Sequence, residues 1–236
     1  STFAQFTDRY IMRNYAVKGG RLNRKTYTQD ELRAIHDGME SLNRFENRLY
    51  LAPMANYTAG GIDAMLQERK AVTGQGIDFI VIDHLDCMSI PREKGQSQFE
   101  ALKETVLQLR AIAIRENAAL LLCAQLSVDA IRNSVGQKDK LPTLDAFRGG
   151  TPTESAKVVV ILNKDKQAML EGTPYVEQQA VICKANDGET GFVRMLFLKP
   201  FAYHIEDVNP SMRSRYSKWL EAVDFPMDYQ RKDVRR

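Results

Sequence analysis

Apolar residues in the N-terminal part of the chain recur at helical spacing. Residues 3–17 show this spacing and predict a helix that ends at Gly19 and Gly20. Thr28 and Glu31 form a capping box, in which each side chain binds a main-chain amide of the other residue, and this marks the start of a second helix. The apolar stripe of that amphipathic helix is expected to contain Leu32, Ile35, Met39 and Leu42.

The middle of the chain contains two runs that are apolar at nearly every position. Residues 77–82 and 119–124 are predicted to be strands, and helices are predicted at 62–72 and 98–116. A strand that is apolar on both faces is typical of a parallel sheet covered by helices on each side. Shorter strands are expected at residues 49–52, 157–163, 176–184 and 192–199.

The last two of these strands flank Asp187 and Gly188, which predict a hairpin turn. We therefore expect an α/β fold with a mainly parallel sheet, helices on both of its faces and an antiparallel hairpin extension near the C-terminus. The sequence becomes mixed after residue 201. We expect one domain over 1–208 and a C-terminal tail over 209–236, which contains one short helix.

Composition narrows the class of protein. The chain has 236 residues, of which 44% are hydrophobic and 27% are charged, so it can bury a full core and is not a disordered polymer. No apolar run approaches the roughly 20 residues of a membrane helix, and no secretory signal is visible. The formal net charge is +3. Residues 211–236 hold seven Lys or Arg and four Asp or Glu, a surplus that leaves nucleic-acid binding open.

The cysteines and histidines suggest no metal centre. Cys87, Cys123 and Cys183 form no CxxC pair, and they lie in or beside apolar runs. We expect them to be buried and reduced, as in a cytoplasmic protein without a membrane anchor. The three histidines are isolated from one another, so structural zinc is not expected.

The strongest candidate for chemistry is Asp83, which ends the first buried strand. The carboxyl edge of a parallel sheet is where open α/β folds bind ligands, and a carboxylate there can hold Mg²⁺ through water. Gln125 ends the next buried strand and would lie beside Asp83 if the strands are neighbours. Its amide could bind a phosphate oxygen or a water molecule. A purely structural role for either residue, as a cap of a turn or strand end, is the alternative.

Two loops offer basic groups. Arg148, Gly149, Gly150 and Thr151 combine a guanidinium, main-chain amides and a hydroxyl, a set that can grip phosphate. Arg92 and Lys94 lie in a loop downstream of Asp83. A flexible surface turn and solvated charges explain these loops equally well.

Residues 19–26 match the length of a phosphate-binding loop, G-x-x-x-x-G-K-T, but Arg24 replaces its second glycine. No apolar strand leads into this segment, and a phosphate-cradling loop needs the strand, the glycine and the helix N-terminus together. We therefore interpret it as a connection between helices. The sequence contains no P-loop.

Four segments, taken in order, resemble DnaB-type replicative helicases, whose C-terminal domain is RecA-like. Residues 80–88 (IVIDHLDCM) resemble the Walker B stretch and 122–126 (LCAQL) the sensor strand. Residues 145–151 (DAFRGGT) are similar to the D-L-R-x-S-G-x loop, and 184–191 (KANDGETG) to the K-x-R-N-G-x-x-G hairpin. The resemblance covers about residues 3–203.

The resemblance implies specific roles for these positions. Asp83 would coordinate Mg²⁺ and Gln125 would sense the γ-phosphate of ATP. Lys184 and the residue at Asn186 would reach the ATP of a neighbouring subunit. Residues Arg148, Gly149, Gly150 and Thr151 would line a channel for single-stranded DNA, with Arg92 and Lys94 as further candidates.

The sequence departs from the family in two respects. The P-loop strand and the catalytic Glu of the family lie upstream of the segment that matches residue 1. The family's arginine finger falls on Asn186, which has no charge to stabilise a phosphoryl-transfer transition state. Arg194 on the next strand is a candidate substitute.

We therefore expect this chain to be part of an ATP-dependent helicase that translocates on single-stranded DNA. The helicase is expected to be a homo-oligomer in the form of a hexameric ring. A primase or a helicase loader is a candidate further partner. The chain alone is expected neither to bind ATP tightly nor to hydrolyse it. The alternative is a non-catalytic RecA-like adaptor or a degenerate helicase homologue, which Asn186 favours. A Mg²⁺-dependent nuclease using Asp83 and Asp86 is a third hypothesis, for which no third acidic ligand is evident nearby.

Overall fold

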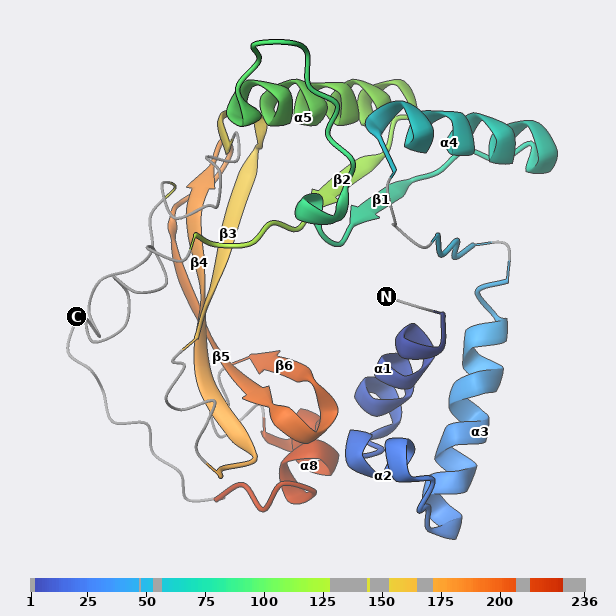
Figure 1. Cartoon of the computed structure of the whole chain (residues 1–236). Coiled ribbons are helices and arrows are strands. Elements are labelled where there is room, and N and C mark those ends of the chain that lie inside the picture. Colours follow the sequence, from blue (N-terminus) through green and yellow to red (C-terminus); the bar gives the residue numbers. More distant parts are fainter. Residues whose placement is uncertain are drawn as a thin grey trace. The chain divides into compact units, whose positions relative to one another are not determined.

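The computed structural model describes residues 3–46, 48–52, 57–127, 144, 153–164, 172–206 and 213–226 (Figure 1). The chain divides into two compact units, which are treated separately. Unit 1 comprises Ser1–Ala52, Leu162–Ala180 and Phe192–Arg236, and unit 2 comprises Pro53–Ile161 and Val181–Gly191. No helix in the described part is both long and apolar enough to span a bilayer.

The described helices and strands follow most of the predicted segments. The helices are α1 (Phe3–Tyr15), α2 (Gly19–Arg24), α3 (Gln29–Asn43), α4 (Ala59–Thr73), α5 (Gln98–Arg115) and α8 (Arg213–Glu221). The strands are β1 (Phe79–Ile82), β2 (Ala119–Leu122), β3 (Val158–Lys164), β4 (Tyr175–Ala185), β5 (Gly191–Leu198) and β6 (Tyr203–Glu206). Short 3-10 helices are η1 (Leu85–Cys87), η4 (Thr153–Ser155) and η5 (Lys199–Phe201).

These strands form two sheets. β1 and β2 pair in parallel, with Ile82 opposite Leu122, and the second sheet has the order β3-β4-β5-β6. β5 and β6 pair antiparallel, with Leu198 opposite Tyr203. The structure therefore confirms an α/β fold with an antiparallel C-terminal part. Our expectation of a mainly parallel sheet is not confirmed among the described residues, where β1 and β2 form a parallel pair.

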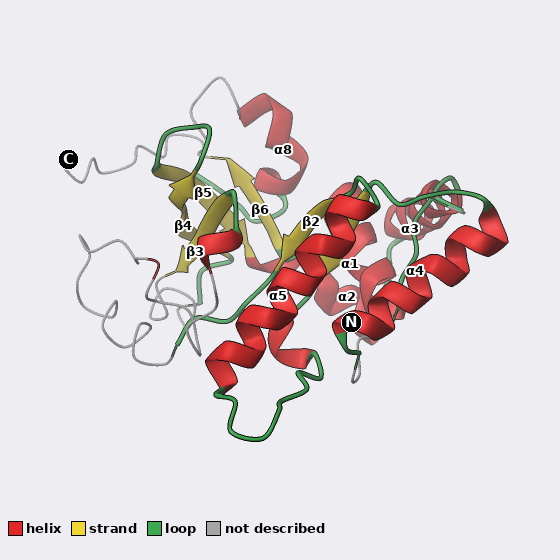
Figure 2. Ribbon diagram, turned by 90° about the horizontal axis from the view of Figure 1, so that it is seen from above, coloured by secondary structure: helices red, strands yellow, loops and turns green. Residues whose placement is uncertain are grey.

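In unit 2, α4 and α5 pack against each other and lie on one side of β1 and β2 (Figure 1 and Figure 2). Both helices begin at a capping side chain: the Thr58 hydroxyl accepts from Gly61 N–H, and Ser97 with Glu100 forms a capping box. The core between helices and strands contains Ile62, Leu66, Ile82, Leu85, Leu102, Val106, Leu109 and Ile112. Burial of this side of the strand pair fixes the positions of the loops that follow each strand.

The other side of the β1–β2 pair is apolar but exposed. Phe79, Val81 and Leu121 retain 57%, 50% and 49% of their accessible surface. These side chains alternate with the packed ones along each strand, as the two-residue period of a strand requires. Among the described residues no helix covers this face, so the predicted helices on both faces are not confirmed; sequence periodicity indicates that a face is apolar and does not identify what covers it.

In unit 1, α1 and α3 pack closely through Gly38. A side-chain carbon on Gly38 would lie 2.9 Å from Cγ1 of Ile11 and 3.2 Å from Cδ2 of Tyr15. The capping box at Thr28 is confirmed, since Thr28 Oγ1 accepts from Glu31 N–H and Glu31 accepts from Thr28 N–H. The predicted apolar stripe is partly wrong: Leu32 and Met39 are exposed, because the contact with α1 follows the small residue Gly38.

Two local predictions near the N-terminus are wrong. Residues 49–52 are not assigned to a strand, and Leu49, Tyr50 and Leu51 are exposed, so their apolar character does not reflect burial in a sheet. Gly19 and Gly20 do not merely end α1, because they begin α2. The left-handed residue Lys25 then ends α2, with its N–H bonded to carbonyls of Arg21 and Leu22.

The core of unit 1 lies between β5, β6 and α8 and is separate from the core of unit 2. It contains Leu196, Leu198, Phe201, Ile205, Tyr216, Leu220, Val223 and Phe225. The short terminal helix expected from the sequence is present as α8, and its apolar residues Tyr216 and Leu220 are buried. Part of the segment that we treated as a tail thus contributes to a core, while the division at residue 208 stays a prediction.

Candidate functional site at the carboxyl edge of the parallel strands

Asp83 and Gln125 follow two strands that are neighbours in the structure. The parallel register of β1 and β2 continues beyond their ends, because Cys123 N–H donates to the Ile82 carbonyl at 3.0 Å and Leu85 N–H donates to the Cys123 carbonyl at 2.8 Å. The side chains of Asp83 and Gln125 are both exposed. We expected Asp83 and Gln125 to lie at the same edge if their strands are neighbours, and the structure confirms that the strands are neighbours.

Gln125 is bound by residues of the turn after β1. Its side-chain Nε2 lies 3.2 Å from Nε2 of His84, and its backbone N–H donates to Oδ2 of Asp86 at 3.4 Å. The peptide bond between Asp83 and His84 is cis. Sequence reasoning placed Gln125 at this edge but missed its contacts with His84 and Asp86. Their position directly after the strand that ends in Asp83 is the signal that could have identified them.

The two cysteines of this edge differ in their surroundings. Cys87 is exposed, contrary to our expectation of burial, and its Sγ lies 3.5 Å from Nε2 of His84. Cys123 is half-buried between the strand ends. Burial, and secondly the negative charge of Asp83, raise the pKa of the Cys123 thiol, so it stays protonated at neutral pH.

Lys184 lies near the end of β4 and makes contacts within its own unit. Its Nζ donates to the carbonyl oxygens of Glu154 at 2.8 Å and of Thr153 at 3.3 Å, both in η4. An ammonium group has three N–H donors, and the contacts among the described residues use two of them. The next positions enter the hairpin turn: Asn186 is exposed, and its N–H donates to the Lys157 carbonyl at 2.9 Å.

The other predicted residues are only partly located. Arg92 and Lys94 are exposed in the loop that precedes α5, as predicted. The guanidinium carbon of Arg194 lies 5.8 Å from the centre of the Phe192 ring. The predicted DNA-binding residues Arg148, Gly149, Gly150 and Thr151 lie outside the described residues. The predicted tail is described only over residues 213–226.

The segment that resembles a phosphate-binding loop is helical. Residues Gly19–Arg24 form α2, in agreement with our interpretation as a connection between helices. No strand leads into α2, because it follows α1 after residues 16–18. Its glycines therefore form no phosphate cradle.

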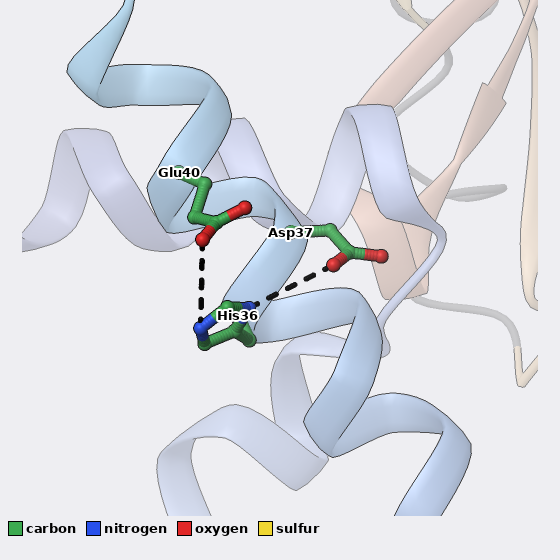
Figure 3. Close-up of side chains that lie close together, drawn as sticks. All are labelled: His36, Asp37 and Glu40. Atoms are coloured by element: carbon green, nitrogen blue, oxygen red, sulfur yellow. Dashed lines mark ion pairs between the residues drawn. The ribbon is translucent and has the colours of Figure 1, made fainter.

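One surface cluster combines metal-ligating side chains, and it lies on α3 (Figure 3). His36 Nδ1 is 3.8 Å from Oδ1 of Asp37, and His36 Nε2 is 3.8 Å from Oε1 of Glu40. All three residues are exposed, and the part of the chain that the structure describes contains no other group of three such ligands. The cluster is an ordinary set of ion pairs along one helix, and we assign no metal to it.

The fold and this edge together define an α/β domain with a carboxylate and an amide at the carboxyl ends of two parallel strands. The family model of the DnaB-like helicase C terminal domain matches residues 2–206, and the chain belongs to this family. The replicative DNA helicase DnaB of Mycoplasma genitalium is 23% identical over 203 residues, which are 81% of this chain and 42% of that protein. The chain thus spans about two fifths of the length of this relative.

Solved structures show the same fold. One of them is an ATPase domain, with a TM-score of 0.72 and 16% identity over 88% of this chain and 72% of that one. A DnaB-like replicative helicase, studied with regard to its interactions with primase, has the same TM-score and identity over 88% of this chain and 49% of that one. These likenesses concern the fold, which agrees with the family that the sequence match assigns.

Proposed function

We propose that this chain provides the Mg²⁺-binding carboxylate and the γ-phosphate-sensing amide of an ATP-dependent replicative DNA helicase. The observation that carries the proposal is the adjacency of Asp83 and Gln125 beyond two paired parallel strands, in a chain of the DnaB-like helicase family. The intact protein would translocate on single-stranded DNA as a homo-oligomeric ring.

The residues at this edge fit a magnesium–nucleotide ligand. Asp83 is an exposed carboxylate with oxygen donors, which Mg²⁺ prefers. Magnesium bound there would neutralise charge on the phosphates. Gln125 offers an amide that can bind a phosphate oxygen. The cradle for the phosphates would come from outside residues 1–236, since the sequence contains no P-loop and the most similar segment is α2.

Contacts between subunits would complete the site. We propose that the third N–H donor of Lys184 reaches the nucleotide of a neighbouring subunit, with the other two held by η4. Asn186 at the hairpin supplies a hydrogen-bonding amide in place of an arginine finger. Arg148, Gly149, Gly150 and Thr151, together with Arg92 and Lys94, are the proposed contacts to single-stranded DNA. A primase or a loader would bind the assembled ring.

The experiment is DNA-stimulated ATP hydrolysis by the native protein that contains this sequence. Asp83→Asn should reduce the hydrolysis rate at least about 100-fold, since it removes the charge that holds the metal. Asp37→Asn, which neutralises an exposed carboxylate on α3, is the matched control and should hydrolyse at the wild-type rate. Hydrolysis by Asp83→Asn at the rate of the control would contradict the proposal.

A non-catalytic RecA-like module is the second candidate, and Asn186 is the observation that favours it. An arginine finger accelerates phosphoryl transfer by about 10³–10⁵-fold, and an uncharged residue at that position does not provide this acceleration. Under this candidate the native protein assembles but hydrolyses no ATP, whatever DNA is added. Sedimentation of the protein together with the hydrolysis assay separates the two. Assembly with hydrolysis supports the helicase, and assembly without hydrolysis supports the module.

The nuclease hypothesis has less support. Asp86 accepts the backbone N–H of Gln125, so one of its two oxygens already has a partner. Among the described residues, Asp83 and Asp86 belong to no group of three metal-ligating side chains. We do not propose this activity.

A further inference from the structure

The turn after β1 holds Gln125 at two points. His84 contacts the side-chain amide at 3.2 Å, and the Asp86 carboxylate accepts the backbone N–H at 3.4 Å. The turn is itself fixed, because Leu85 between them is buried in the core of unit 2 and its N–H donates to Cys123. The position of the Gln125 amide therefore depends on residues 84–86, which directly follow Asp83.

The chemistry of the contact determines which groups of the amide stay available. A glutamine Nε2 carries two N–H donors and no acceptor, so Nε2 of His84 must be the acceptor. The proton of the neutral ring is then on Nδ1. Among the described residues, this contact uses one N–H of Gln125 and leaves the other N–H and Oε1 for a ligand. His84 thereby restricts the rotation of the amide and selects the direction of its second donor.

We propose that His84 is a positioning residue for Gln125, which it orients by accepting one of the two amide hydrogens. This inference rests on the proposed role of Gln125 at the γ-phosphate. It adds that the sensing amide and the metal-holding carboxylate are attached to one short segment: Asp83 begins it, and His84 and Asp86 bind Gln125. A displacement of this segment would change both groups together.

The Cys87 thiol is the competing partner of His84. Its Sγ lies 3.5 Å from the same ring nitrogen, and a thiol is a weak donor. If His84 acted through Cys87 and did not orient Gln125, loss of the imidazole ring would change the environment of Cys87. The orientation of the Gln125 amide would then stay the same. A test must therefore follow Gln125 directly and must also separate turnover from binding.

The kinetic test uses the native protein with saturating single-stranded DNA. His84→Leu removes the acceptor, whereas His84→Gln keeps an oxygen at comparable reach. We expect His84→Leu to lower kcat about ten- to hundred-fold with KM for ATP changed less than about threefold, as for a misplaced group that acts in turnover. His84→Gln should recover most of kcat. His84→Leu combined with Gln125→Ala should be no slower than Gln125→Ala alone.

The control is His36→Leu, the same substitution at an exposed histidine on α3, which should leave kcat unchanged. Wild-type kcat in His84→Leu, or losses that multiply in the double variant, would overturn the positioning role while leaving the role of Gln125 intact. Unchanged hydrolysis in Gln125→Ala would instead refute the role of Gln125 on which the inference rests.

A spectroscopic arm is independent of turnover. In nitrogen-15 spectra of the native protein, one side-chain amide proton of Gln125 should be shifted away from its position in a solvated glutamine, because that proton is bonded to the His84 ring. His84→Leu should bring this shift toward that of a solvated glutamine, and His84→Gln should do so less. Shifts that are the same in all three proteins would overturn the inference, and thermal unfolding identifies any variant that fails to fold.

Discussion

Nζ of Lys184 lies 2.8 Å from the carbonyl oxygen of Glu154, so the lysine proposed to reach a neighbouring nucleotide also binds η4 of its own chain. Lys184→Met should therefore have two effects. It should lower the free energy of unfolding by roughly 1–3 kcal/mol, because two carbonyls lose a charged donor. It should also reduce DNA-stimulated ATP hydrolysis. Urea unfolding and the hydrolysis assay measure the two effects.

Lys157→Met is the control for stability, because the Lys157 side chain is exposed on a neighbouring segment of unit 2. It should change the unfolding midpoint little. Equal midpoints for the two variants would show that the contacts of Lys184 with η4 contribute nothing to folding.

The approach of α1 to α3 at Gly38 leaves no room for a side chain. Gly38→Val should lower the free energy of unfolding by about 1–3 kcal/mol, because the branched carbons would overlap Ile11 and Tyr15. Gly20→Val is the matched control, since a side-chain carbon on Gly20 meets no atom within 4 Å. Denaturant titration of both variants checks this. If the variants unfold at the same denaturant concentration, the packing described for α1 and α3 is wrong.

The α4–α5 pair is linked by Arg115, which donates to Asp63 with two guanidinium nitrogens and to Glu116 at 3.0 Å. These hydrogen bonds from Arg115 are the main cause that holds the pKa of Asp63 and the pKa of Glu116 below their usual values. The stabilisation is therefore present above the unfolded-state pKa values of about 4 and is lost as the pH falls through the lower folded-state values.

Arg115→Gln should accordingly lower the melting temperature at pH 7, and the loss should become smaller toward pH 2.5, as the carboxylates are progressively protonated. Arg110→Gln, at an exposed position of the same helix, should lower it much less at either pH. Melting curves of the three proteins across this pH range provide the measurement. A loss that is equally large at pH 2.5 would show that Arg115 acts through packing.

The reactivity of the cysteines tests the environment of Asp83. Iodoacetamide at pH 7 should modify the exposed Cys87 before Cys123, because burial and the charge of Asp83 raise the pKa of the Cys123 thiol. Raising the pH to 9 should increase modification of Cys123. Asp83→Asn should increase it at pH 7, since one of the two causes is removed. Mass spectrometry of the peptides follows each site, and no effect of Asp83→Asn would place its carboxylate away from β2.

Much of this fold could be predicted from periodicity. Strong signals came from the apolar runs that form β1 and β2 and from the apolar stripe of α5. Few other secondary structures would bury apolar residues in these patterns. β6 was missed because it is short and begins two residues after the end of η5, and its one neighbouring strand among the described residues is β5. The exposure of Leu32 and Met39 could not be anticipated, because the face that α1 contacts is decided by Gly38, a residue without hydrophobic signal.

The positions of Asp83 and Gln125 in the candidate site could be predicted from the sequence, whereas the contacts that hold Gln125 could not. Asp83 and Gln125 directly follow the apolar runs 77–82 and 119–124, so their types and positions are informative. The contacts of Gln125 with His84 and Asp86 depend on the path of one turn, which sequence spacing does not specify. The unexpected exposure of Cys87 has the same origin, since it belongs to η1 in that turn.

We propose that the edge formed by Asp83 and Gln125 couples ATP hydrolysis to DNA unwinding in the native protein. The most direct measurement is unwinding of a forked duplex by the native protein with Mg²⁺ and ATP, comparing wild type, Asp83→Asn, Gln125→Ala and the control Asp37→Asn. We predict unwinding by wild type and the control, and loss of at least about 100-fold in rate for the other two. Unwinding by Asp83→Asn and Gln125→Ala at the wild-type rate, or no unwinding by any of the four proteins, would contradict the claim.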